Sequence, residues 1–151
     1  METNPFDFTG LTTETLGVGA PWFYALDLQV VTDIFGLKEP TSGHEEGHIL
    51  RPVWDSSGCW CCSLNYDDGD ECNWKPARFS KDEEMALRIV EKMRSEFPYV
   101  RIDWIGTWGV SFQVGGDVTS VIWSPVVSAD TLPVAICVAA LLAKGKVVTR
   151  P

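Results

Sequence analysis

The 151-residue chain carries 12 lysine and arginine residues against 21 aspartate and glutamate residues, a formal net charge of −9. Hydrophobic residues make up 45% and charged residues 22%, a balance that is typical of one globular domain and excludes a wholly disordered or low-complexity protein. The longest apolar run, Leu132 to Ala143, is shorter than the roughly 20 residues that a membrane-spanning helix needs. Five cysteines, and an N-terminus without a signal-peptide pattern, predict a reducing compartment.

The negative charge is concentrated in the first half of the chain. Residues 1–79 contain 13 acidic and 4 basic residues, whereas residues 80–151 contain 8 of each. An acidic surface repels the phosphates of DNA and RNA, so we expect no direct nucleic acid binding. The same surface suits a basic protein partner or a cation, although such charge also serves solubility alone.

The first 40 residues predict an irregular segment followed by a helix. Residues 1–20 are rich in threonine and glycine and lack a sustained hydrophobic period, which is typical of a mobile or irregular arm. From Pro21 to Gly36, apolar residues recur at helical spacing. Because proline suits the first turn of a helix and glycine its end, we expect the first helix between these two residues.

Residues 39–79 are the least regular part of the chain. They contain both histidines, four of the five cysteines and three of the seven tryptophans. Short strands are expected at Val53–Trp54 and from Cys59 to Tyr66, joined by a turn at residues 55–58. Because a structureless stretch of this length is unusual in a small domain, we expect some interaction to hold it in place.

A second helix is predicted to begin at Ser80 and to stop at Pro98. The four residues from Ser80 to Glu83 fit a capping box, in which a hydroxyl and a carboxylate satisfy free backbone donors. Proline ends a helix because it has no N–H to donate. The expected apolar stripe consists of Leu87, Val90, Met93 and Phe97, with Ala86 and Ile89 beside it.

Three alternating segments follow, and they predict an antiparallel meander. They span residues 99–105, 108–114 and 118–127, with a strong hairpin signal at Gly115-Gly116-Asp117. Pro125, in the third segment, indicates a sheet edge or a bulge.

The last predicted element is a helix that is apolar nearly all round. We expect Asp130 to cap it, Pro133 to lie in its first turn, and its residues from Leu132 to Ala143 to be deeply packed.

These segments resemble the phage ABA sandwich domain family. The resemblance rests on SKDEEMALRIVEKMRSEF, on the three Trp-rich strands and on SADTLPVAICVAALLAKG, the most specific part. LDLQVVTDIFGLK, from Leu26 to Lys38, is similar to the family's first element. The resemblance spans residues 22–38 and 76–145, and residues 39–79 occupy the place of a family insertion. It implies a phage or prophage gene, a sandwich of helices and strands, and no established activity.

The pattern and the resemblance together predict an α+β fold, a three-stranded antiparallel meander packed with helices in the order ααβββα. The Cys/His/Trp-rich insertion lies between the first two helices. We expect an N-terminal arm at residues 1–20, one domain at 21–145 that contains the insertion at 39–79, and a tail at 146–151.

A zinc site is one interpretation of the insertion. Cys59 and Cys62 form a C-x-x-C pair, and Cys72 and His48 lie near them in the sequence. Zinc requires about four such donors in a tetrahedron, and its binding energy would order the segment. The spacing is not that of a standard zinc motif, and the alternative is buried or free thiols.

Two other groups of residues in the insertion are weaker candidates for a functional site. Either Cys61 or Cys62, with a histidine and an aspartate of the insertion, would complete a Cys-His-Asp set, but nothing in the spacing indicates it. The acidic turn at residues 67–71 lacks the spacing of a calcium loop and is typical of a solvated turn or a partner-binding surface. Its acidic members are Asp67, Asp68, Asp70 and Glu71.

The tryptophans of the insertion suggest a recognition surface. Their faces, together with a nearby arginine, could stack on and clamp an anionic, nucleotide-like molecule or anchor a protein partner. They could equally form a hydrophobic cluster that folds the insertion. The residues concerned are Trp54, Trp60, Trp74 and Arg78.

From these observations we expect a small, non-enzymatic phage accessory protein of the host cytoplasm, with no catalytic residues. Its acidic surface would bind and inhibit a host protein, for instance a defence protein, that presents a basic surface. The alternatives are sequestration of a small anionic signal molecule by the Trp-rich insertion and a zinc-stapled interaction module.

Overall fold

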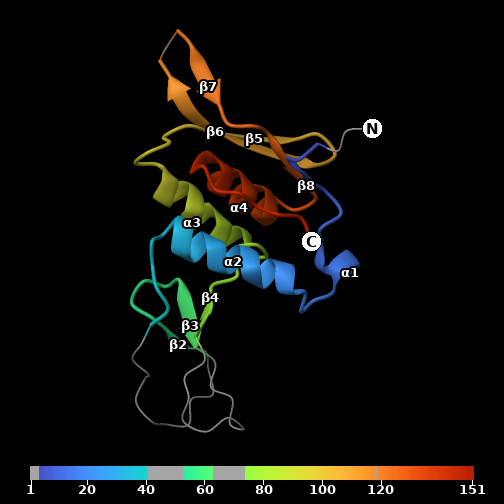
Figure 1. Cartoon of the computed structure of the whole chain (residues 1–151), viewed down its shortest axis with the longest axis vertical. Helices are drawn as coiled ribbons and strands as arrows, with labels where there is room; N and C mark the ends of the chain where they lie inside the picture. The colour runs from blue at the N-terminus through green and yellow to red at the C-terminus, as the bar shows by residue number, and fades with distance from the viewer. Residues whose placement is uncertain (1–3, 41–52, 63–73, 118) are drawn as a thin grey trace, which may run out of the picture.

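The computed structural model has an α+β fold in which helices separate two sheets of different size (Figure 1). It describes residues 4–40, 53–62, 74–117 and 119–151. A five-stranded sheet lies at one end of the long axis and a three-stranded sheet at the other. The helices between them are α2 (Pro21–Asp33), α3 (Glu83–Met93) and α4 (Leu132–Ala143). The α+β class is therefore confirmed.

The larger sheet is mixed rather than a three-stranded meander. Its strand order is β1-β8-β6-β5, and β7 pairs with the far part of β6. All pairs are antiparallel except β1 with β8, which run parallel. The strands are β1 (Asp7–Phe8), β5 (Val100–Trp104), β6 (Trp108–Gly116), β7 (Val121–Trp123) and β8 (Val127–Ala129). The predicted order ααβββα thus lacks β1, which comes from the N-terminal segment. It also has one strand where the structure has two, β7 and β8.

Pro125 explains why the third predicted strand is two strands. It lies between β7 and β8, and proline has no N–H for the ladder. Next to it, the Ser124 hydroxyl accepts from the N–H of Phe112 at 2.9 Å, and the Ser124 N–H donates to the Phe112 carbonyl at 2.8 Å. A register shift between Gln113 and Gly115 accompanies this break.

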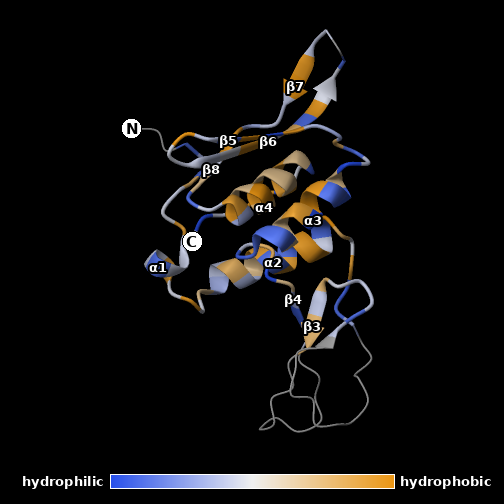
Figure 2. Ribbon diagram, turned by 180° about the vertical axis from the view of Figure 1, so that it is seen from behind, coloured by the Kyte–Doolittle hydropathy of each residue, from blue (hydrophilic) through white to orange (hydrophobic). Residues whose placement is uncertain are grey.

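The β6–β7 hairpin follows the glycine signal of the sequence and projects beyond the helices (Figure 2). Gly116 has φ +89°, and a Cβ there would lie 1.8 Å from the Ser120 carbonyl oxygen. No other residue type fits this turn without moving its backbone.

The N-terminal segment is more ordered than the predicted arm. Phe8 in β1 is buried, and α1 (Thr13–Leu16) is held by a reciprocal capping box between Thr12 and Thr15. A two-residue strand and a four-residue helix are too short to leave a hydrophobic period in the sequence, so the pattern predicted an irregular segment.

Helix α4 forms the centre of the core, as predicted. It is buried along nearly its whole length and contacts β6, β8, α2 and α3. Its cap is Thr131 instead of Asp130, whose carboxylate accepts from the Gly10 N–H at 2.9 Å. In the part of the chain that the structure describes, no helix combines the length and apolarity needed to cross a bilayer.

Helix α3 begins later than predicted and buries a different stripe. Asp82 caps it by accepting from the Met85 N–H at 3.2 Å, so Ser80 is not the cap. The helix ends at Met93, before Pro98. Leu87 is half exposed, while the buried residues are Ala86, Ile89 and Met93. Helix α3 packs against α4, so this stripe faces the core.

The smaller sheet consists of β2 (Val53–Trp54), β3 (Trp60–Cys62) and β4 (Trp74–Pro76), in that order and antiparallel. Its first two strands and the turn at residues 55–58 confirm the predicted hairpin, whose end beyond Cys62 lies outside the described residues. Strand β4 packs on α2.

Candidate functional site

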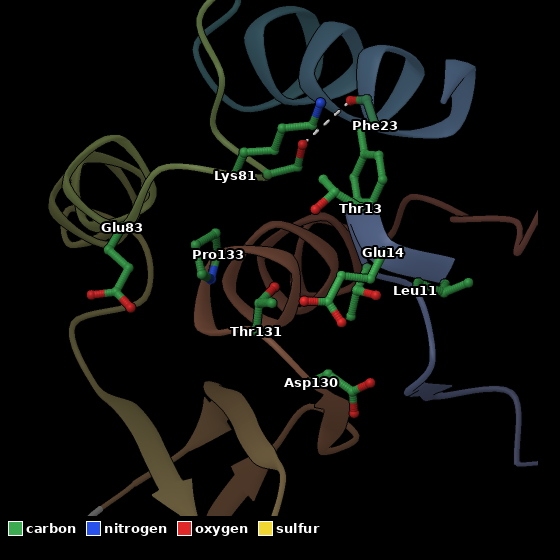
Figure 3. Close-up of a pocket in the computed structure, with 11 residues that line it drawn as sticks. Leu11, Thr13, Glu14, Phe23, Lys81, Glu83, Asp130, Thr131 and Pro133 are labelled. Atoms are coloured by element: carbon green, nitrogen blue, oxygen red, sulfur yellow. Dashed lines mark hydrogen bonds between the residues drawn. The ribbon is translucent and has the colours of Figure 1, made fainter. Parts of the chain in front are cut away.

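A pocket of about 380 Å³ lies where the starts of three helices meet (Figure 3). Its walls come from residues 11–14 at α1, residues 80, 81 and 83 at the start of α3, residues 130, 131 and 133 at the start of α4, and Phe23 of α2. Segments that are far apart in the sequence therefore share this pocket only through the fold.

Carboxylates outnumber cations in the walls of the pocket. Glu14, Glu83 and Asp130 come from three different segments; Figure 3 shows Glu14 and Asp130 beside Thr131, and Glu83 farther away, beyond Pro133. Acidic groups at helix N-termini stabilise the helices, because the first backbone N–H groups carry partial positive charge. They also give the pocket formal negative charge, since its walls contain one lysine.

That lysine is already engaged by the protein. The ammonium of Lys81 donates to the Val18 carbonyl oxygen at 2.8 Å and lies 5.0 Å from the centre of the Phe23 ring. A carbonyl and an aromatic face both attract a cation. The lysine thus ties the start of α3 to the N-terminal segment, and its donors are partly used.

A buried hydroxyl in the same wall has no partner. Thr131 Oγ1 is buried and makes no hydrogen bond within the described part of the chain. Buried polar atoms are normally satisfied by protein or by an ordered molecule. This oxygen is thus an acceptor in the pocket wall without a partner among the described residues, and its own surface is closed to solvent.

Asp27 supports the pocket from behind. Its buried carboxylate accepts from the Ser80 backbone N–H at 2.7 Å, and the Ser80 hydroxyl donates to the Phe23 carbonyl at 3.4 Å. Burial raises the pKa of Asp27 to about 7, although the bond from Ser80 acts in the opposite direction. Asp27 thereby fixes the position of Ser80, a wall residue, relative to α2.

The tryptophans of the predicted recognition surface do not line this pocket. Trp60 and Trp74 are buried in the smaller sheet, whereas Trp54 is half exposed and Arg78 is exposed. Burial leaves the faces of Trp60 and Trp74 to pack against the protein, as expected of a hydrophobic cluster that folds the insertion.

Two of the four residues of the predicted metal site, Cys59 and Cys62, lie in the described part of the chain, at β3. The Ala77 N–H donates to the Cys59 carbonyl, so Cys59 continues the ladder of β3. Residues three apart on a strand, such as Cys59 and Cys62, face opposite sides of the sheet. The described residues contain no group of three metal-ligating side chains, and His48 and Cys72 lie outside them.

Burial favours the protonated form of three of the cysteine thiols. Burial raises the pKa of Cys59 and of Cys61, and it raises that of Cys137 in α4 much further. The Cys59 thiol donates to the Ser57 carbonyl at 3.8 Å. Burial thus disfavours a thiolate nucleophile at these three positions.

The sequence carried a partial signal for the pocket. Ser80, Asp130 and Pro133 stand out as residues of helix starts, but nothing in the pattern shows that these starts converge. The acidic turn predicted as a partner surface, with Asp67, Asp68, Asp70 and Glu71, lies outside the described residues.

The chain matches the family model described as the phage ABA sandwich domain over residues 44–141. One solved structure, a phage protein from Bacillus cereus ATCC 14579, is 21% identical, with 78% of this chain and 83% of that chain covered and a TM-score of 0.45. No curated protein matches the chain significantly.

Proposed function

Because the chain belongs to the phage ABA sandwich domain family, we propose that it is a phage accessory protein that binds a basic surface of a host protein. The family has no established function, so the proposal comes from the site. The site offers carboxylates and a buried acceptor in a pocket rather than an activated nucleophile or an acid–base pair. We therefore propose a binding function without catalysis.

The observation that carries the proposal is the combination of charge and an unpartnered acceptor in one pocket. Glu14, Glu83 and Asp130 attract a cation, and the Thr131 hydroxyl oxygen lacks a donor in the described residues. A lysine or arginine side chain of a partner supplies both a positive charge and several N–H donors. The volume of about 380 Å³ falls within the range of ordinary ligand pockets.

The charge of the whole chain supports the same partner. With a net charge of −9, the protein attracts a basic surface over distance, and the pocket then fixes one side chain of it. We propose that a host protein covered in this way loses access to its own partners and is thereby inhibited. The same carboxylates repel an anionic signal molecule, and the buried Trp60 and Trp74 offer it no open stacking face.

The first experiment measures whether the pocket binds a cationic side chain. NMR spectra of the labelled protein are recorded during titration with Nα-acetyl-arginine amide and with its neutral citrulline analogue. We expect shifts at Ser80, Lys81 and Thr131 with the arginine compound alone. Equal shifts with both compounds, or shifts elsewhere, would contradict a cation site in this pocket.

The second experiment links the pocket to a host partner. Wild-type protein and the Glu14→Gln/Glu83→Gln variant capture proteins from host lysate, beside a Glu39→Gln/Glu91→Gln control that removes the same charge at exposed positions away from the pocket. A specific partner should be lost with the pocket variant and retained with the control. Equal loss in both variants would mean that net charge alone drives capture.

A further inference from the structure

Strand β5 is the most open edge of the larger sheet. It is a terminal strand of five residues, and it pairs with β6 without a register shift. The other edge strands of that sheet are β1, with two residues, and β7, with three residues beside a register shift. Short or bulged edges resist pairing with another chain, and β5 has neither protection.

The hydrogen bonds to β6 show which backbone groups of β5 face outward. The Gln113 N–H donates to the Tyr99 carbonyl, and the Ile105 N–H donates to the Thr107 carbonyl. In an antiparallel pair, alternate residues bond the same neighbour. The odd-numbered residues from 99 to 105 therefore bond β6, and the N–H and C=O groups of Val100, Ile102 and Trp104 point to the free edge.

We propose that β5 pairs with β5 of a second copy of this chain, antiparallel about a two-fold axis at Ile102. This register places Val100 opposite Trp104 of the second copy, and Ile102 opposite its own equivalent. These residues carry the outward-facing groups, so each pair exchanges two N–H···O=C bonds. One continuous sheet then crosses the interface, and the contact is the same on both sides.

The side chains of β5 are complementary to themselves in this register. On the face away from the helices, Arg101 lies opposite Asp103 of the second copy, and Tyr99 lies opposite Ile105. Tyr99 is 63% exposed and Ile105 is 86% exposed, so the register covers two apolar side chains that are otherwise in solvent. Opposite charges and apolar residues that face one another stabilise neighbouring strands.

The charges also select the register. Arg101 and Asp103 occupy the solvent face of β5, and a shift by two residues would remove their opposition. In the monomer, the Arg101 guanidinium lies 5.2 Å from the centre of the Trp123 ring, across β6. It is exposed there, so it can turn toward the carboxylate of the second copy. This inference does not depend on the acidic pocket.

Charge exchange tests the proposal. In Asp103→Arg, two arginines oppose each other across the axis, and in Arg101→Asp two aspartates do. We expect each variant to dimerise about ten-fold or more weakly than wild type in sedimentation equilibrium, because like charges directly opposite destabilise the pair. The Arg101→Asp/Asp103→Arg double variant restores both pairs, and so does an equimolar mixture of the two single variants.

Hydrogen exchange assigns the interface to β5. The amides of Val100, Ile102 and Trp104 should become protected as protein concentration rises, while those of Arg101 and Asp103 are protected at all concentrations by β6. A wild-type protein that stays monomeric overturns the proposal. So does a dimer that both single variants leave intact, because it then uses another surface.

Discussion

The two sheets of this protein are held by different forces. In the larger sheet, Val110 and Phe112 of β6 and Val127 of β8 are fully buried, and they lie against α4, which is itself buried almost throughout. Burial of this kind contributes about 25 cal/mol for each Å² of apolar surface removed from water. The larger sheet and α4 therefore form the main source of stability.

The smaller sheet depends more on polar contacts at its turn. Arg88 of α3 donates to the Gly58 carbonyl at 2.9 Å and to the Ser57 carbonyl at 3.0 Å. The Asp55 carboxylate accepts from the Ser57 hydroxyl at 2.7 Å and from the Trp60 N–H at 3.2 Å. Three short strands bury little apolar surface, so these hydrogen bonds supply part of the stability of the smaller sheet.

Together, the two sheets show how a small domain keeps an insertion in place. The side chains of Arg88 and Asp55 hold the turn by hydrogen bonds. Trp60 and Cys62 of the adjoining strand are buried against the rest of the protein. We expect the smaller sheet to open locally without loss of the larger one.

The largest effect should come from a charge in the apolar region. Ile136 in α4 is fully buried, and an Ile136→Asp variant places an unpaired carboxylate there, at a cost of several kcal/mol, on the order of the stability of a whole domain. We expect no soluble folded protein, judged by expression and circular dichroism. A folded variant with the wild-type melting temperature would remove α4 from the centre of the core.

Asp27 lies on α2, the helix between the two regions, and should make stability depend on pH. Its pKa is 3.8 in the unfolded chain and about 7 when folded, so the native state binds the proton more tightly. Its contribution to the free energy of unfolding is greatest below about pH 4. It falls as the pH rises toward 7, by up to about 1.4 kcal/mol per pH unit.

An Asp27→Asn variant removes this dependence and keeps an oxygen acceptor for the Ser80 N–H. We expect its free energy of unfolding, measured by urea titration, to exceed that of wild type above pH 7 and to approach it near pH 4. Parallel curves for the two proteins over this interval would show that Asp27 is not the titrating group.

Removal of the Arg88 guanidinium should affect one region only. Arg88→Met keeps the apolar stem and loses two hydrogen bonds to backbone carbonyls, worth about 1–3 kcal/mol together. Hydrogen exchange should accelerate at Trp60 and Cys62 and stay unchanged at Val110. Lys92→Met, which removes one positive charge from an exposed position on the same helix, is the matched control and should change neither.

The smallest effect on stability is expected at the acidic turn of the insertion. Replacement of Asp67, Asp68, Asp70 and Glu71 by serine should leave the melting temperature unchanged and slow association with a basic partner, because charge steers the encounter. Surface plasmon resonance at several salt concentrations measures this. An association rate with the same salt dependence as wild type would exclude the turn from the binding surface.

The sequence determined the elements whose pattern repeats over several turns or residues. Leu132 to Ala143 is apolar on all sides, and such a helix is stable only when surrounded. The alternation from Val100 to Trp104 and from Trp108 onward gave β5 and β6 because side chains on a strand face opposite sides in turn. The family followed from the same segments, since the family match over residues 44–141 covers β5, β6 and most of α4.

Other features depend on contacts between residues that are distant in the sequence, and no local pattern predicts them. β1 pairs with the free edge of β8, and a two-residue strand is too short to carry a pattern that predicts this pairing. Asp130 and Ser80 look like helix caps, but each bonds a group far away, Gly10 and Asp27. The acidic pocket has the same origin: helix starts carry acidic and hydroxyl residues for local reasons, and only the packing of α1, α3 and α4 brings those starts together.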